Sequence, residues 1–239
     1  MRNKTINLLL SLLCIGCTKS TEHTAITVLF DTSEIDFQQR IEALGIDKVI
    51  FEEAAIRLSD ETMFNGARVR FNFLNELSQS PGISLELAAG KGGLFGENPH
   101  VREEEVRLFQ KQLSDTIANL IGHTAKFGSR QSKIYRRFCR ELQLLTEEAA
   151  ENKMLVICSD MLENSDVFNL YDTGDNPALD DPEGFAERVL ENDCSLPDLS
   201  GVDIKIFLLG TGENDEYVHN AERFWRAVFL KKGAKSVTF

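Results

Sequence analysis

Basic residues are scarce in this sequence, which has 26 Lys and Arg against 38 Asp and Glu and a formal net charge of −12. A surface of this sign repels a nucleic-acid backbone and anionic lipid headgroups. We therefore expect no nucleic-acid partner. An acidic surface suits solubility, divalent cations or basic partners.

Several catalytic and cofactor motifs are missing. The four histidines are dispersed, and none lies beside a Ser or Cys nucleophile in a triad-like motif. The glycine-rich loop at 90–100 lacks the Lys-Ser/Thr ending of a phosphate-binding loop. Asp31 has Ser33 two residues later, where a haloacid-dehalogenase-type phosphatase needs a second Asp. The sequence therefore offers no recognisable catalytic set, and we expect a protein that is not an enzyme.

Cysteine is also sparse beyond the first twenty residues. After Cys17 there remain Cys139, Cys158 and Cys194, with no Cys-x-x-Cys pair or Cys/His cluster, which argues against zinc. Apolar periodic contexts predict that Cys139 and Cys158 are core residues, whereas Cys194 lies in a predicted loop. An oxidising compartment would permit a disulfide, but the spacing does not determine its pairing.

The N-terminal apolar run is too short to cross a membrane. It covers eleven residues, Ile6 to Gly16, and follows a basic start at Arg2 and Lys4, as in a secretory signal. The stretch LCIGC at 13–17 resembles the bacterial lipoprotein signal, although Cys14 stands where that family usually has Leu.

The lipoprotein resemblance implies a particular organisation and location. Residues 1–16 would be a signal peptide, and 17–25 would comprise a lipidated Cys17 and a polar tether. Lipid would anchor the protein to a membrane of the bacterial envelope, facing the periplasm or the surface. Thr18, by resemblance to enteric lipoprotein sorting, favours the outer membrane.

Strand and helix patterns alternate from residue 26 to the end. Short apolar runs predict strands at 26–30, 67–75, 82–90, 154–160, 202–212 and 235–239. Helical periodicity predicts helices at 36–60 with a break at Gly45, and at 101–123, 131–153, 182–193 and 214–235. We therefore predict one α/β domain over 26–239, with a doubly wound, mostly parallel sheet, one antiparallel edge strand and flanking helices.

Two acids follow predicted strands at the point where each strand ends. Asp31 comes directly after the first strand, and Asp160 ends the continuous apolar run MLVICSD. The carboxyl ends of parallel strands share one edge of a sheet, where ligands bind in such folds. We expect Asp31 and Asp160 to lie together at that edge.

The order of elements and these acids resemble the von Willebrand factor A-type family. Its metal-ion-dependent adhesion site has an Asp-x-Ser-x-Ser motif after the first strand. Asp31 and Ser33 match the first two positions, whereas Ile35 replaces the third and cannot coordinate a metal. Asp160 matches the Asp that ends the family's fourth strand.

The remaining position in the family pattern is a Thr before the third helix. In SKIYRRF, Ser132 takes that place, with Ser129 as a nearby substitute. The resemblance implies a Mg²⁺ site formed by Asp31, Ser33, Ser132 and Asp160, because Mg²⁺ prefers oxygen ligands and tolerates waters.

Alternatives remain open for these residues and for their function. The site could be degenerate and metal-free, with the two Asp side chains capping the following helices. The resemblance implies a membrane-anchored module that binds a protein partner in the cell envelope. The alternative is a metal-assisted phosphohydrolase that uses Asp31 and Asp160.

Overall fold

A six-stranded sheet forms the centre of the molecule in the computed structural model, which describes residues 21–32, 37–74, 82–93, 96–124, 133–172, 174–209 and 216–239. The strand order is β3-β2-β1-β4-β5-β6, and every neighbouring pair is parallel except β2 and β3. The strands are β1 (His23–Phe30), β2 (Gly66–Phe73), β3 (Ile83–Leu87), β4 (Asn152–Ser159), β5 (Val202–Leu208) and β6 (Ser236–Thr238). The predicted mostly parallel sheet with one antiparallel edge strand is confirmed.

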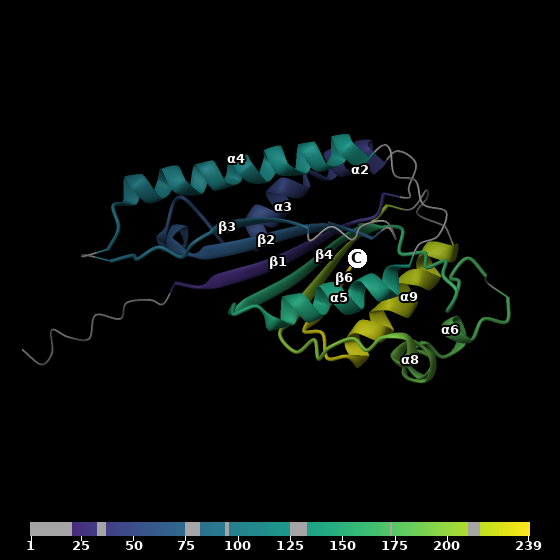
Figure 1. Ribbon diagram of the computed structural model, residues 1–239. Coiled ribbons are helices and arrows are strands. Elements are labelled where there is room, and N and C mark those ends of the chain that lie inside the picture. The colour runs from purple at the N-terminus through teal and green to yellow at the C-terminus, as the bar shows by residue number, and fades with distance from the viewer. Residues whose placement is uncertain are drawn as a thin grey trace, which may run out of the picture.

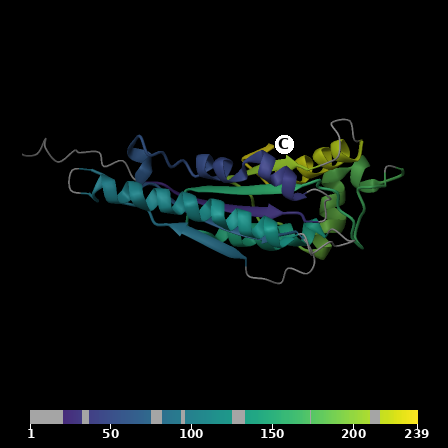
Figure 2. The same ribbon diagram turned by 90° about the horizontal axis from the view of Figure 1, so that it is seen from above.

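Helices cover both faces of this sheet (Figure 1). One layer contains α2 (Phe37–Leu44), α3 (Ile46–Glu53) and α4 (Pro99–Thr124), with the short 3-10 helix η1 (Glu61–Phe64). The other layer contains α5 (Ile134–Glu147), α6 (Pro177–Asp180), α7 (Pro182–Phe185), the π-helical turn η2 (Ala186–Leu190), α8 (Glu191–Asp193) and α9 (Glu216–Lys231). Seen from above, α4 runs along the length of the sheet (Figure 2).

The central strands are buried on both faces, as expected of parallel strands between two helical layers. Along β1, Ile26, Val28 and Phe30 pack with the α2–α4 layer, whereas Ala25 and Leu29 pack with the α5–α9 layer. This alternation follows from the two-residue side-chain period of a strand. It fixes the register in which the carboxyl ends of β1 and β4 meet.

An aromatic cluster around Trp225 fills the second layer. Trp225, Phe224 and Phe229 of α9 are fully buried, with the Trp225 ring centroid 5.1 Å from that of Phe224 and 5.8 Å from that of Phe229. Phe138 of α5 lies 5.1 Å from Trp225. These residues are therefore core, as their helical spacing indicates.

A buried charge network joins α5 to β2 in the same layer. Glu141 is only 1% exposed and accepts a 3.0 Å hydrogen bond from Asn72 Nδ2. Arg70 and Arg137 each approach the Glu141 carboxylate at 3.6 Å, and Arg137 Nε donates to Phe73 O at 2.8 Å. Burial lowers the pKa of Arg137. Glu141 thus compensates charges that would otherwise be costly to bury.

Some predicted element boundaries were wrong. The predicted helix over 36–60 ends at Glu53, and Gly45, at φ 57°, separates its two parts as expected. The predicted helix at 131–153 ends at Glu147, because Asn152 and the next residue already pair in β4. β1 begins at His23, so the last three residues of the predicted tether belong to the sheet.

A disulfide ties α5 to the segment after α8. Cys139 and Cys194 are bonded across 55 residues, whereas Cys158 is a free, buried thiol whose pKa is raised by burial. Cys139 is half-buried and packs against the core as predicted, and the structure supplies the disulfide pairing that the spacing left open. Periodicity indicates which face of a helix is buried, but it does not show which distant loop packs on that face.

No helix in the described part of the chain combines the length and the apolar character that crossing a membrane would require.

Candidate functional site

Asp31 and Asp160 lie at the same edge of the sheet, at the carboxyl ends of the adjacent strands β1 and β4. The register pairs Phe30 with Cys158, and the Asp31 N–H extends the ladder by donating to Cys158 O at 2.9 Å. Asp31 is 2% exposed and Asp160 is 4% exposed. The structure therefore brings these two acids to the edge where we expected them.

Ser159 links the two strands at this edge and was not singled out in the sequence analysis. Its Oγ donates to Asp31 Oδ2 at 2.7 Å and accepts a 2.9 Å hydrogen bond from the Met161 N–H. The hydroxyl is fully buried. Its signal in the sequence is its position beside Asp160 at the end of a buried strand, but only the strand register shows that it faces Asp31.

Donors in the described part of the chain include two that hold the Asp160 carboxylate. Oδ1 accepts from the Leu162 N–H at 2.9 Å, and Oδ2 accepts from the Tyr171 hydroxyl at 3.3 Å. Met161, which lies between Asp160 and Leu162 in the chain, has φ 63°, a left-handed conformation that is unfavourable for a non-glycine residue. Trp225 Nε1 donates to Met161 O at 2.8 Å and so stabilises this turn.

Capping by Asp31 stays a prediction, because residues 33–36 before α2 lie outside the described residues. Capping by Asp160 is wrong, because the next described helix is α6, which begins at Pro177 and has Asn176 as its N-cap. Asp160 instead bonds the N–H two residues onward, as in an Asx turn.

Three of the predicted site residues cannot be placed. Ser33, Ser132 and the lipidation candidate Cys17 lie outside the described residues, as does Ser129. Within the described ranges, no group of three or more His, Cys, Asp or Glu side chains could hold a metal ion.

The described donors nevertheless fit a hard divalent cation in kind. Two carboxylates and one hydroxyl, from Asp31, Asp160 and Ser159, lie at one edge of the sheet, and oxygen is the ligand type that Mg²⁺ takes. A complete shell would draw its further oxygens from Ser33, Ser132 and water.

Glu163, three residues after Asp160, binds the start of a helix. Its Oε2 accepts a 2.9 Å hydrogen bond from the Tyr135 N–H in the first turn of α5. Burial raises its pKa to about 7, although hydrogen bonds from Ser165 and from the helix oppose this shift. Glu163 is therefore partly protonated at neutral pH and serves as a helix-terminal acceptor.

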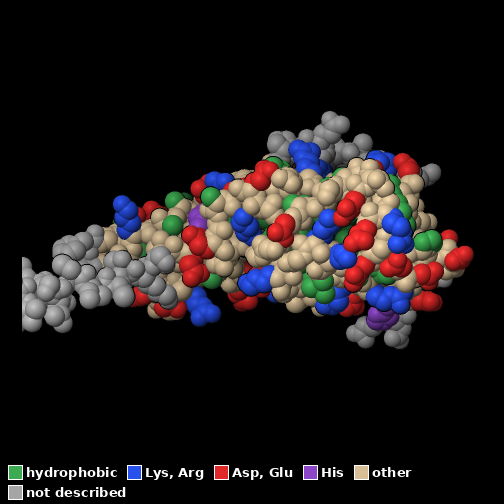
Figure 3. Space-filling view, turned by 90° about the horizontal axis from the view of Figure 1, so that it is seen from below, with side chains coloured by type: hydrophobic (Ala, Val, Ile, Leu, Met, Phe, Trp, Pro, Cys, Tyr) green, Lys and Arg blue, Asp and Glu red, His purple; other side chains and the backbone are tan. Residues whose placement is uncertain are grey.

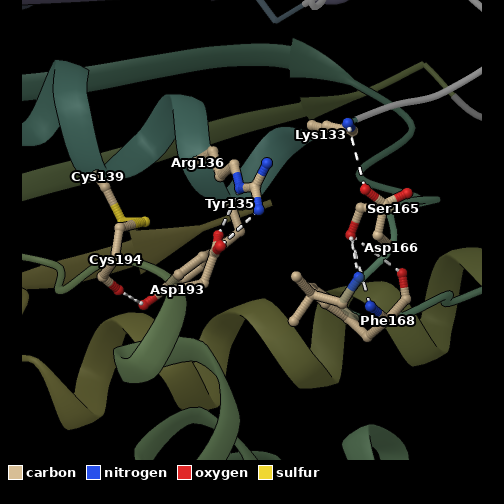
Figure 4. A network of polar contacts seen from close by, with 10 residues as sticks. Lys133, Tyr135, Arg136, Cys139, Ser165, Asp166, Phe168, Asp193 and Cys194 are labelled. Atoms are coloured by element: carbon tan, nitrogen blue, oxygen red, sulfur yellow. Dashed lines mark hydrogen bonds and ion pairs between the residues drawn. A yellow bond between two sulfur atoms is a disulfide. The ribbon is translucent and has the colours of Figure 1, made fainter.

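A small hollow lies beside the start of α5. Its walls are formed by Lys133, Tyr135, Arg136, Glu163, Ser165, Val167, Phe168 and Asp193. Figure 4 shows that its polar side chains are already paired. Arg136 donates to Asp193 at 2.6 and 2.7 Å, and Lys133 forms an ion pair with neighbouring Asp166 at 3.6 Å. Tyr135 donates from its hydroxyl to the Cys194 carbonyl at 2.9 Å, next to the disulfide. These contacts fasten the 193–194 segment to α5.

Two tyrosines lie in contact next to Asp160. Tyr171, in the loop after β4, is 45% exposed, and Tyr217, in the first turn of α9, is 39% exposed. Their ring centroids are 6.2 Å apart, and the Tyr171 hydroxyl donates to Asp160. No local pattern in the sequence predicts this pair, because the two residues are 46 positions apart in the chain.

Comparison with known proteins gives only distant matches. No protein-family model and no curated protein matches the sequence. Among solved structures, the pilus adhesin SpaC from Lactobacillus rhamnosus GG in its open conformation is similar over 93% of this chain and 28% of its own, with TM-score 0.44 and 10% identity. The human COPII-coat protein Sec24c is similar over 92% of this chain and 30% of its own, with TM-score 0.39 and 14% identity. The chain thus spans less than a third of either protein, and similarity this distant carries no functional argument.

Proposed function

We propose that this chain is a von Willebrand factor A-like module that binds a protein partner through the carboxyl edge of its sheet. The observation that carries the proposal is that Asp31 and Asp160 lie at the carboxyl ends of the adjacent strands β1 and β4, with an exposed pair of tyrosines next to Asp160. Aromatic residues that are apolar on one side and polar on the other are enriched in protein interfaces.

We further propose that the module is anchored by lipid on Cys17 in a bacterial envelope, with the outer membrane favoured. The Cys139–Cys194 disulfide supports an oxidising compartment, because disulfides form and persist outside the reducing cytosol. The lipoprotein-like leader supplies the rest of this argument.

The metal part of the proposal concerns Mg²⁺. Asp31, Ser33, Ser132 and Asp160 would hold the ion, which when bound would accept a carboxylate from the partner. In this chain, Ser159 orients the Asp31 carboxylate, and the Leu162 N–H and Tyr171 hydroxyl orient Asp160.

Two experiments test this proposal on the full-length protein. Cys17→Ser should move the protein from the membrane fraction to the soluble fraction, and mass spectrometry should detect acyl chains on the wild type alone. Calorimetric titration with Mg²⁺ should give heat with wild type and none with Asp31→Ala. Equal heats would remove Asp31 from any metal site, whereas an unacylated wild type would remove the anchor.

The second candidate, a metal-assisted phosphohydrolase, rests on the same two carboxylates at one edge. Phosphatase turnover with Mg²⁺ that disappears in both Asp31→Asn and Asp160→Asn would favour it over the binding module. Absence of turnover with a panel of phosphomonoesters would count against it.

A further inference from the structure

The exposed contact between Tyr171 and Tyr217, here named the tyrosine pair, provides an aromatic surface at the carboxyl edge. Tyr171 is 45% exposed to solvent and Tyr217 is 39% exposed. Large aromatic side chains of this kind dominate the energetics of protein interfaces. The tyrosine pair is therefore a surface on which a partner group can stack.

The chain around Tyr171 is strongly acidic. Between Lys153 and Arg188 there are nine Asp and Glu residues and no Lys or Arg. Acidic side chains project from the end of the molecule where α6 lies, on the right in Figure 3. A partner that binds here should carry positive charge, because interfaces pair surfaces of opposite charge.

Several of these acids are already neutralised by other elements. Asp166 is paired with Lys133, Asp181 with Arg188, and both Glu183 and Glu187 with Lys231.

Two acids beside Tyr171 retain their charge at the surface. Asp172 and Asp175 are exposed, and neither makes an ion pair with another described residue. Among the described residues, Asp172 Oδ1 accepts the local N–H of Gly174 at 3.1 Å, which orders the loop without cancelling its charge. Negative charge thus lies at the surface in the same loop as Tyr171.

We infer that the partner presents a basic segment, with an Arg or Lys side chain over the tyrosine pair and its charge facing Asp172 and Asp175. This inference rests on the proposed function and names the chemical class of the partner. Cations bind the faces of Tyr rings, and a guanidinium group stacks on them as well. Carboxylates beside the rings add attraction that weakens with salt.

The test uses fluorescently labelled Arg-Gly repeat peptide as probe, with a Glu-Gly repeat of the same length as the charge-reversed control. Full-length protein in detergent is titrated by fluorescence anisotropy at two salt concentrations. Tyr171→Ala/Tyr217→Ala should weaken binding of the basic peptide about tenfold, because two stacking faces are lost. Tyr217→Phe keeps the second ring and leaves the Tyr171 hydroxyl on Asp160, so it should bind like wild type, whereas Tyr217→Ala should not.

Charge variants separate this site from the general acidity of the protein. Asp172→Asn/Asp175→Asn should weaken binding about threefold and reduce its salt dependence. The matched control is Glu104→Gln/Asp115→Asn, which removes two exposed acids from α4 on the opposite face of the sheet. Equal weakening in both charge variants, or equal loss in Tyr217→Phe and Tyr217→Ala, would overturn the inference.

Failure of this inference can be distinguished from failure of the proposed function. Tyr171→p-benzoylphenylalanine allows photo-crosslinking in the native envelope, followed by sequencing of the crosslinked peptide. A crosslinked segment rich in Lys or Arg supports the inference. A captured segment without basic residues overturns the inference but keeps the binding module. If no crosslink forms at this position and the basic peptide does not bind, both the inference and the proposed binding function are overturned.

Discussion

Burial of Glu163 should make the stability of this protein fall as pH rises through neutrality. Its pKa is about 7 in the folded state against an ordinary value of 4.5. A raised folded pKa contributes stability that is complete below pH 4.5 and is lost as pH rises through about 7. The shift of roughly 2.5 units corresponds to about 3 kcal/mol of unfolding free energy, at about 1.4 kcal/mol for each unit.

The variant that isolates this effect is Glu163→Gln. The amide oxygen can still accept from the Tyr135 N–H, but the side chain is neutral at every pH. We expect Glu163→Gln and wild type to differ little near pH 4.5. By pH 8.5 the variant should have gained about 3 kcal/mol relative to wild type.

Urea unfolding from pH 4.5 to 8.5, followed by the fluorescence of the single, buried Trp225, measures these free energies. Comparison with wild type removes the contributions of every other titrating group. Glu104→Gln, which removes an exposed acid from α4, controls for the loss of one charge. An offset between Glu163→Gln and wild type that does not change with pH would refute the reasoning.

Three further predictions concern the cross-link, the buried network and the sheet edge. Cys139→Ser/Cys194→Ser should lower the unfolding free energy by about 4 kcal/mol, from the loop entropy of a 55-residue separation, and adding reductant should then change nothing further in that variant. Glu141→Ala should cost about 3–5 kcal/mol because it leaves two arginines without their shared carboxylate, and a loss below 1 kcal/mol in urea unfolding would contradict this. Ser159→Ala should lower the unfolding free energy by about 1–3 kcal/mol, since Asp31 Oδ2 and the Met161 N–H each lose a partner. A thermal unfolding midpoint equal to that of wild type would contradict this.

Much of the fold could be predicted because its signals are local. The continuous apolar run of β4 and the alternation in β2 were sufficient to place a buried strand and a half-buried strand. Gly45 marked the break between α2 and α3, because a left-handed residue there favours glycine. Helix ends were less predictable, since tertiary contacts decide where α5 stops and β4 begins.

The candidate site was predictable only in part. Asp31 and Asp160 could be placed at one edge because parallel strands end together. Ser159 could not be linked to Asp31, because that contact depends on the register between strands 128 residues apart. The role of Glu163 could not be read from its neighbours in the sequence, because it depends on the hydrogen bond from the Tyr135 N–H of α5 and on burial that raises its pKa.

The sequence by itself determined the alternation of strands and helices, the acidic character and the two acids at strand ends, since each depends on neighbouring residues or on simple counts. Only the tertiary structure decided the Cys139–Cys194 pairing, the burial of Glu163 and the meeting of Tyr171 with Tyr217. Each of these depends on how separate elements pack, and the packing of separate elements is not encoded in any local pattern.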